Sequence, residues 1–219
     1  MKRLVAFGDS YTYGDGLADC WVKHSSDNYT SGNVCSQYAW PALVAKNLGY
    51  SVVNSSCSGL SNLGMLHRLL NTVFTENDVC VIMWSFPHRD MIFNKNYMPH
   101  IANFNTNRDY TNRTTHVGSW MDDDLTKYWM LTHNNTDLLI RSWLHIHHAN
   151  LYLDSLNIPH YNFFINYGQL KSHKPSYIKI PFADILVERY IDRALDGDHP
   201  GPLSQERMAK EITLLIDHL

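Results

Sequence analysis

The sequence predicts an α/β domain, a three-layer α/β/α sandwich in which a central parallel sheet lies between two layers of helices. Short apolar runs alternate along the chain with segments of helical periodicity, and this alternation is typical of repeated strand–helix units. Two runs, Arg3–Phe7 and Asp78–Trp84, are apolar at most positions, as expected for strands buried on both faces of a parallel sheet. The loops at the carboxyl ends of such strands usually carry the functional site.

The length and composition indicate one globular domain over residues 1–219. With 44% hydrophobic and 18% charged residues, a chain of this size can bury one sizeable core. The net charge is −3 without a basic run, which argues against nucleic acid or an anionic membrane as the main ligand. No apolar stretch approaches the roughly 20 residues of a membrane-spanning helix. The run Leu4–Phe7 is too short for a signal-peptide core, so we expect a cytoplasmic protein.

The first half of the chain alternates strands with helices. The stretch before Trp40 is polar and irregular, and the helix that starts there has Pro41 in its first turn and Gly49 directly after its end, which are typical start and stop signals. A turn at Gly59–Asn62 leads into the second helix. The expected elements, strand, helix, strand, helix and strand, are Arg3–Phe7, Trp40–Leu48, Ser51–Asn54, Leu63–Val73 and Asp78–Trp84.

The second half begins with a segment of little periodicity, at about 86–124, which we interpret as an insertion near the site because ordinary connections are much shorter. Ser204 is expected to be the N-cap of the last helix, with Arg207 and Lys210 facing outward. The expected elements are one or two helices in Leu125–Leu156, a strand at Tyr161–Ile165, and helices at Ala183–Ala194 and Ser204–Leu219.

The cysteines and histidines do not form a metal-binding pattern. The four cysteines lack paired zinc-site spacing, and we interpret them as free thiols, with a Cys20–Cys35 disulfide as the alternative. His145, His147 and His148 stand at positions i, i+2 and i+3 of a predicted helix, where they do not converge as ligands at i and i+4 would. We therefore expect no metal site.

The segment Gly8-Asp9-Ser10-Tyr11 directly follows the first buried strand. Gly8 permits a tight turn, and backbone amides after the turn point toward whatever the Ser10 hydroxyl attacks, so the geometry suits a nucleophile. The alternative interpretation is a plain turn, because these residue types are common in turns. Which reading holds depends on the other motifs of the chain.

A carboxylate and an imidazole stand three residues apart near the end of the chain, in Asp196-Gly197-Asp198-His199. A carboxylate at this spacing can hold an imidazole in the tautomer that accepts a proton from a serine. We therefore expect Asp196 to orient His199, with Asp198 competing for that role. The alternative is an aspartate that caps the last helix beside a surface histidine.

The third motif is the small-residue loop after the second strand, from Ser55 to Gly59. The amide of Gly59 can donate a hydrogen bond to an oxyanion, although Gly59 can also be an ordinary turn glycine. Together, in the order in which they occur along the chain, Gly-Asp-Ser after the first strand, Gly59 after the second and Asp-x-x-His-Pro near the end, the three motifs resemble the SGNH (GDSL-like) hydrolase family. The resemblance implies that family's flavodoxin-like fold, with short matching blocks between Gly8 and Pro200.

The resemblance also implies a role for each site residue. Ser10 is the nucleophile, His199 the general base and then the acid, and Asp196 its orienting carboxylate. The amides of Ser10 and Gly59 are expected to form the oxyanion hole. Asp9 and Tyr11, which flank Ser10, are expected to contact the substrate.

One departure from the family pattern concerns the segment after the third strand. The family usually has an asparagine there that donates to the oxyanion, whereas this chain has Trp84-Ser85-Phe86-Pro87-His88-Arg89. Losing such a donor costs about 2.7–4 kcal/mol of transition-state stabilisation, so we expect a substitute. The candidates are the hydroxyl of Ser85 and the charge of Arg89, although Arg89 can instead bind a substrate carboxylate or form a structural ion pair.

The predicted function is hydrolysis of a carboxylic ester or related acyl bond through an acyl-enzyme on Ser10, without a cofactor. The substrate is expected to be a small-molecule, carbohydrate or lipid ester, with a slight preference for a carbohydrate O-acetyl group. The alternative is a catalytically degenerate binding or structural module. Aromatic residues of the insertion and its flank can line a substrate cleft or simply cover the core: Phe93, Tyr97, Phe104, Tyr110, Trp120 and Trp129.

Overall fold

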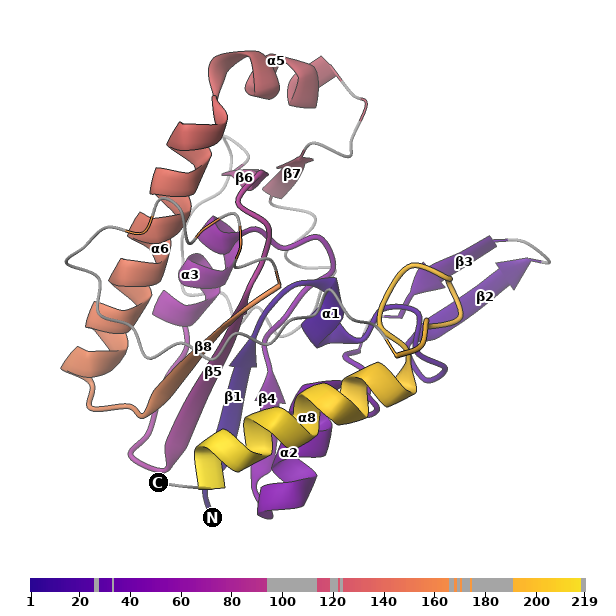
Figure 1. Ribbon diagram of the computed structural model, residues 1–219, viewed down its shortest axis with the longest axis vertical. Coiled ribbons are helices and arrows are strands. Elements are labelled where there is room, and N and C mark those ends of the chain that lie inside the picture. The colour runs from indigo at the N-terminus through magenta and orange to yellow at the C-terminus, as the bar shows by residue number, and fades with distance from the viewer. Residues whose placement is uncertain are drawn as a thin grey trace.

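The computed structural model describes residues 1–25, 28–32, 34–93, 114–118, 122, 124–165, 168, 170, 174 and 191–217 (Figure 1). Its centre is a four-stranded sheet in the order β4-β1-β5-β8, in which every neighbouring pair is parallel. The strands are β1 (Arg3–Phe7), β4 (Ser51–Asn54), β5 (Asp78–Trp84) and β8 (His160–Phe164). The first three strands have the predicted bounds, and the fourth begins and ends one residue earlier than the predicted Tyr161–Ile165.

Helices cover both faces of this sheet. On one face lie α2 (Trp40–Leu48) and α8 (Pro202–Asp217), and on the other lie α3 (Asn62–Leu70) and α6 (Asn135–Ser155) (Figure 1). The side chains of β1 alternate between the faces, since Leu4 and Ala6 pack with α2 and α8 whereas Val5 and Phe7 pack with α3 and α6. The predicted three-layer α/β/α architecture is confirmed.

Several short elements were not predicted. Ser10 begins a one-turn helix, α1, and an antiparallel hairpin occupies the stretch that the sequence marked as irregular. The insertion contains a second antiparallel pair, while its middle, 94–113, lies outside the described residues. The region expected to hold one or two helices contains two. The two helices of that region are α5 (Asp124–Thr132) and α6, and the elements that were not predicted are α1 (Ser10–Tyr13), β2 (Trp21–Ser25), β3 (Asn28–Ser31), β6 (Arg89–Phe93) and β7 (Thr114–Gly118).

The start of α8 differs from the prediction. Ser204 is buried inside the first turn rather than capping it, because the helix begins at Pro202. The capping acceptor comes from another segment: the Asp192 carboxylate accepts from the amides of Leu203 (3.0 Å) and Ser204 (2.8 Å). The predictions that Ser204 is the N-cap and that the preceding helix reaches 194 are therefore wrong, since 191–194 are not helical. Most of that predicted helix, 183–190, lies outside the described residues.

Two further predictions concern the helices. The second predicted helix ends three residues early, as α3 stops at Leu70. Arg207 and Lys210 are exposed on α8, as predicted. Within the described ranges, no helix is both long enough and apolar enough to cross a membrane.

Asp78 anchors the start of the central strand β5. Its side chain is fully buried, yet it accepts hydrogen bonds from Arg3 Nε (2.7 Å) and from the amide of Thr75 (2.7 Å). Burial by itself raises the pKa of the Asp78 carboxyl, but the hydrogen bonds from Arg3 and Thr75 outweigh it and lower the pKa below the ordinary value of 3.8. The carboxylate is therefore ionised in the folded protein at neutral pH and ties Arg3 to the edge of the core.

Replacing Asp78 by Asn is expected to reduce the free energy of unfolding at pH 7 by about 1.5–3 kcal/mol, the typical contribution of a hydrogen bond to a charged group. Because the folded-state pKa is lowered, this contribution exists above the ordinary carboxyl pKa and is lost as the pH falls through the folded-state value. Urea unfolding of both proteins at pH 7 and near pH 3 measures the effect. A difference in stability that stays the same at both pH values would contradict this account.

Candidate active site

An open cavity of about 480 Å³ lies beyond the carboxyl ends of the central strands. Its walls come from the loops that follow β1, β4 and β5 and from the segment before α8. The sequence motifs predicted to carry chemistry therefore contribute to one cavity. The lining residues are Ser10, Ser58, Gly59, Phe86, His88, Arg89, Asp198 and His199.

The turn at the end of β1 presents Ser10 to this cavity. Gly8 is required because a Cβ there would lie 1.9 Å from the Oγ1 of Thr12. Asp9 caps α1 by accepting a hydrogen bond from the amide of Tyr11 (3.0 Å). Ser10 then becomes the first residue of α1, lining the cavity although only 3% of its surface is exposed.

Asp196 and His199 form the pair that the sequence suggested. Asp196 Oδ2 lies 2.6 Å from His199 Nδ1, and Oδ1 accepts from the amides of Asp198 (3.0 Å) and His199 (3.1 Å). Burial raises the pKa of Asp196, but these hydrogen bonds outweigh it and lower the pKa. An ionised carboxylate at this distance requires a proton on Nδ1, which leaves Nε2 as the acceptor of a further proton.

Two alternatives were left open for this segment: Asp198 as the carboxylate that orients His199, and Asp196 as the helix cap. The hydrogen bonds of Asp198 are made by its backbone, since its amide donates to Asp196 and its carbonyl accepts from Arg193 (2.6 Å). The helix cap is supplied by Asp192, not by Asp196. Among the described residues, no hydrogen bond joins the hydroxyl of Ser10 to His199, although both line the cavity.

Tyr11 packs against the imidazole of His199. The two ring centroids are 5.6 Å apart with nearly perpendicular planes, and the Tyr11 ring also meets Phe86 edge-on at 6.5 Å. The carbonyl of Tyr11 accepts a hydrogen bond from Gln205 Nε2 (3.0 Å), which joins α1 to α8. Tyr11 is therefore placed to support the imidazole and is not among the lining residues.

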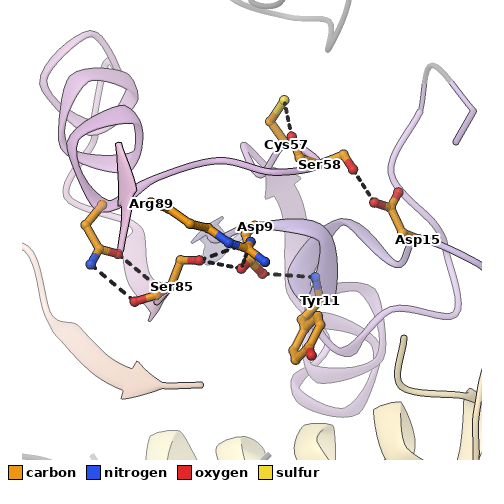
Figure 2. A network of polar contacts seen from close by, with 8 residues as sticks. Asp9, Tyr11, Asp15, Cys57, Ser58, Ser85 and Arg89 are labelled. Atoms are coloured by element: carbon orange, nitrogen blue, oxygen red, sulfur yellow. Dashed lines mark hydrogen bonds and ion pairs between the residues drawn. The ribbon is translucent and has the colours of Figure 1, made fainter. Parts of the chain in front are cut away.

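The loop after β4 is held from two sides. The buried Arg68 donates to the carbonyls of Ser55 (2.9 Å) and Ser56 (3.0 Å), and the hydroxyl of Ser58 donates to the carboxylate of Asp15 (Figure 2). Gly59, which follows, has a φ of +69°, in the left-handed region that glycine tolerates. The loop thus reaches the cavity in a fixed conformation.

A buried polar network lies behind the part of the cavity wall that is formed by the loops after β1 and β5 (Figure 2). Asp9 is fully buried, and its Oδ2 accepts from the Ser85 hydroxyl (2.6 Å) and pairs with Arg89 Nη1 (2.8 Å). Ser85 is also buried, and its amide donates to Asn62 Oδ1 (2.8 Å), while Asn62 Nδ2 donates to the Ser85 carbonyl (3.2 Å). Asn62 was not predicted to contribute, because nothing in its spacing signals this contact.

This network bears on two predictions. Asp9 is not placed to contact a substrate, since none of its surface is exposed and its carboxylate has three partners in the protein. Ser85 is not an oxyanion donor in this arrangement, because a hydroxyl has one proton and the Ser85 hydroxyl gives it to Asp9. Of the candidates after the third strand, Arg89 is the one that lines the cavity.

Arg89 and His88 both pack on Phe86. The Arg89 Cζ lies 4.9 Å from the centroid of the Phe86 ring, and the His88 ring stacks on it at 6.2 Å with an interplanar angle of 25°. Burial, reinforced by the charge of Arg89, lowers the pKa of His88, so its imidazole is neutral near pH 7. Phe86, His88 and Ser58 were not predicted as cavity residues, although their place at the ends of β5 and β4 is a signal that could have found them.

The remaining sequence candidates lie elsewhere. His145, His147 and His148 are on α6, where burial, followed by the charges of Arg141 and His148, lowers the pKa of His145 to about 4. The part of the chain that the structure describes contains no group of three or more His, Cys, Asp or Glu side chains able to hold a metal ion. All four cysteines are free thiols, so the alternative disulfide is not formed.

Only one of the six aromatic candidates has a described side chain. Trp129 is buried with Val117 and Leu138, which supports the packing interpretation for this residue. The other five candidates, namely the side chain of Phe93 and the residues Tyr97, Phe104, Tyr110 and Trp120, lie outside the described residues.

Solved structures share this fold over almost the whole chain. A protein of the G-D-S-L family from Desulfitobacterium hafniense DCB-2, described as lipolytic, has a TM-score of 0.53 at 14% identity, covering 98% of this chain and 99% of its own. This chain has the GDSL fold. The psychrotrophic esterase EstA from Pseudoalteromonas sp. gives a TM-score of 0.50 at 12% identity, with 100% and 98% coverage. A Corynascus thermopiles family 2 carbohydrate esterase with a carbohydrate-binding domain gives 0.52 at 14%, with 98% and 65% coverage.

The similarity is visible in the structure and not in the overall sequence. No family model matches the sequence, and no curated protein matches it significantly. At 12–16% identity, the comparison establishes the fold and does not assign roles to individual residues.

The position of Asp196 depends on Gly16. This glycine has a φ of +78°, and a Cβ there would lie 2.6 Å from Asp196 Cγ and 2.8 Å from the Cβ of Ala194. The carbonyl of Gly16 also accepts from the amide of Leu195 (2.9 Å). The loop that carries the Asp196 carboxylate therefore packs directly on the backbone of Gly16.

Gly16→Ala is expected to displace Asp196 and weaken its hydrogen bond to His199. Gly49→Ala is a matched control, since Gly49 also has a positive φ (+67°) but its Cβ would meet nothing within 4 Å. The control loses about 1–2 kcal/mol from backbone strain alone, whereas Gly16→Ala loses a further 1–3 kcal/mol or so from overpacking. Urea unfolding measures the stabilities, and the low-field proton resonance of the His199 Nδ1–H reports the hydrogen bond. Equal losses and an unchanged resonance would contradict this account.

Proposed function

We propose that this protein is a serine hydrolase that cleaves a carboxylic ester through an acyl-enzyme on Ser10. The observation that carries the proposal is the 2.6 Å contact between Asp196 and His199, whose imidazole lines a cavity that Ser10 also lines. A carboxylate, an imidazole and a serine at the carboxyl ends of parallel strands are the parts that acyl transfer requires. The names of the structural relatives, which include esterases, agree with this chemistry.

The proposed reaction has two halves. In the first, Ser10 Oγ attacks the ester carbonyl carbon while His199 Nε2 takes the hydroxyl proton, and the carbonyl π electrons move to oxygen. The resulting oxyanion is held by the amides of Ser10 and Gly59. When it collapses, the alcohol leaves with the proton from His199. In the second half, His199 activates water in the same way, and the acid is released with regeneration of Ser10.

The ionised Asp196 contributes by stabilising the imidazolium that forms when His199 holds the proton. Its carboxylate also fixes Nδ1 as the protonated nitrogen, so Nε2 faces the reaction. Tyr11, packed edge-on against the imidazole, limits rotation of the ring. Both contacts keep His199 in the orientation that the proposed proton transfers need.

The cavity lining favours a polar ester with a short acyl group. Among the described lining residues, Phe86 is the one large apolar side chain, while the others are hydroxyl, imidazole, charged or glycine residues. A long acyl chain needs an apolar channel to gain from burial. A carbohydrate O-acetyl ester is polar and has a short acyl group, which supports an O-deacetylase among the possible esterases. The similarity to a carbohydrate esterase agrees with this substrate class.

A second candidate is a binding module that keeps the fold with a degenerate site. It is favoured by the missing asparagine donor, by the involvement of Ser85 in a buried contact, and by the lack of a hydrogen bond between Ser10 and His199 within the described residues. One structural relative was described as a carbohydrate esterase whose active site has both catalytic and non-catalytic binding functions. Reactivity of Ser10 distinguishes the two candidates.

Ser10→Ala is expected to reduce hydrolysis of p-nitrophenyl acetate at least about 10³-fold, because the variant has no nucleophile. The wild-type protein should be labelled at Ser10 by a fluorophosphonate, with the site found by mass spectrometry. Ser155→Ala is the matched control, since Ser155 is an exposed serine at the end of α6, away from the cavity lining, and its variant should still be labelled at Ser10. A folded wild-type protein that neither hydrolyses nor labels would support the binding module.

The acyl preference is expected to favour acetate. Along a series of p-nitrophenyl esters from acetate to octanoate, kcat/KM of the wild-type protein should fall at least about tenfold. The described walls offer no apolar channel that would return about 0.8 kcal/mol for each buried methylene group. The longer esters are measured below their aggregation concentrations. A rise in kcat/KM with chain length would contradict the deacetylase assignment and favour an acyl-chain hydrolase.

A further inference from the structure

Arg89 brings a positive charge to the cavity that holds Ser10 and Gly59. Among the described lining residues it is the one lysine or arginine. Its side chain is only 15% exposed, so water and salt screen this charge less than they screen a surface arginine. A charge in such a position acts strongly on any charge that develops in the cavity.

The guanidinium of Arg89 is fixed before any substrate binds. Nη1 pairs with Asp9 Oδ2 at 2.8 Å and lies 3.3 Å from the Ser85 hydroxyl, while Cζ lies 4.9 Å from the centre of the Phe86 ring. These contacts hold the guanidinium in place, so little reorganisation remains to be done when charge develops. Figure 2 shows Arg89 reaching across to the carboxylate of Asp9.

The Asp9–Arg89 pair has a direction relative to the cavity. Asp9 is fully buried and is not a lining residue, whereas Arg89 lines the cavity. The pair is therefore a fixed dipole with its positive end toward the cavity and its negative end in the protein. Oriented dipoles of this kind stabilise negative charge that forms at their positive end.

Other side chains near the third strand are less suited to this task. The Ser85 hydroxyl donates to Asp9, and the Asn62 amide donates to the Ser85 carbonyl (3.2 Å) and the Ser142 hydroxyl (3.2 Å). The imidazole of His88 is neutral near pH 7. Of these side chains, Arg89 is the one that carries a positive charge and also lines the cavity.

We propose that Arg89 is a catalytic residue that stabilises the oxyanion in place of the family's missing asparagine. This inference rests on the proposed ester hydrolysis at Ser10. When Ser10 Oγ forms its bond to the carbonyl carbon, the π electrons move to the carbonyl oxygen, and Arg89 stabilises that negative charge until the C=O bond reforms and the alkoxy group leaves. Arg89 gains and loses no proton in either half of the reaction.

The test compares Arg89→Met, Arg89→Lys and the wild-type protein with p-nitrophenyl acetate, an uncharged ester. Methionine is used because, unlike glutamine, it has no amide that could donate to the oxyanion. Removing one oxyanion donor typically lowers kcat by 10²–10³-fold, and Arg89→Met is expected to fall in about this range while KM changes less than about threefold. Arg89→Lys keeps the charge and is expected to recover at least about tenfold in kcat. Arg207→Met, the same substitution at an exposed site on α8, is expected to keep the wild-type kcat.

Arg89→Met leaves the buried Asp9 without its ion-pair partner and can fail to fold for that reason. The double variant Asp9→Asn/Arg89→Met removes both charges and keeps an acceptor for the Tyr11 amide. It is expected to fold and to lose kcat, by less than the single variant does, because the negative charge of Asp9 that repels the oxyanion is removed as well. The rate of Ser10 labelling by a fluorophosphonate, whose phosphoryl oxygen occupies the oxyanion position, should fall in parallel.

Distinct results would overturn the inference. A raised KM with unchanged kcat would make Arg89 a ground-state binding residue. Loss of kcat in Ser85→Ala but not in Arg89→Met would assign the role to the hydroxyl. In both cases the wild type is active and Ser10→Ala inert, so the proposed function stands. If the folded wild type neither hydrolyses esters nor reacts with the fluorophosphonate, the proposed function fails, and this inference fails with it.

Discussion

The loops after β1 and β5 are both held by the buried carboxylate of Asp9. One oxygen caps α1 and so places Ser10 at the end of β1, while the other receives Ser85 and Arg89 from the loop after β5. A fully buried charge without partners is strongly destabilising, so these two loops must meet at Asp9 for the protein to fold. The residue next to the proposed nucleophile is thus a structural junction.

The imidazole side of the cavity is built on different contacts. Asp196 packs on the backbone of Gly16, and α8 begins where Asp192, four residues before Asp196, caps its first turn. The helix end and the Asp196–His199 pair are therefore fixed by neighbouring parts of one short segment. Tyr11 links this segment to the loop after β1, because its amide donates to Asp9 and its ring packs against His199. The two halves of the proposed triad are coupled through that residue.

The sequence predicted the layers well because burial on both faces leaves a continuous apolar run, and β1 and β5 have such runs. The β2–β3 hairpin was missed because its strands, Trp21–Ser25 and Asn28–Ser31, are polar and carry little alternation. For the site, spacing identified Ser10, Asp196 and His199 as candidates. It could not separate Asp9 and Ser85 from the cavity wall, since adjacency in sequence does not reveal which side chain turns inward, and the Asn62 contact joins residues 23 positions apart.

The negative charge of Asp9 also gives a physical reason for an arginine, Arg89, in the loop after β5. An oxyanion formed beside Ser10 is a second negative charge close to a buried carboxylate. Like charges a few ångströms apart repel, by about 4 kcal/mol at 4 Å and an effective dielectric constant of about 20. A neutral asparagine amide would leave that repulsion in place, whereas the guanidinium that pairs with Asp9 and lines the cavity offsets it. The buried carboxylate that anchors the loops therefore favours a cation at the position where the family pattern has an amide.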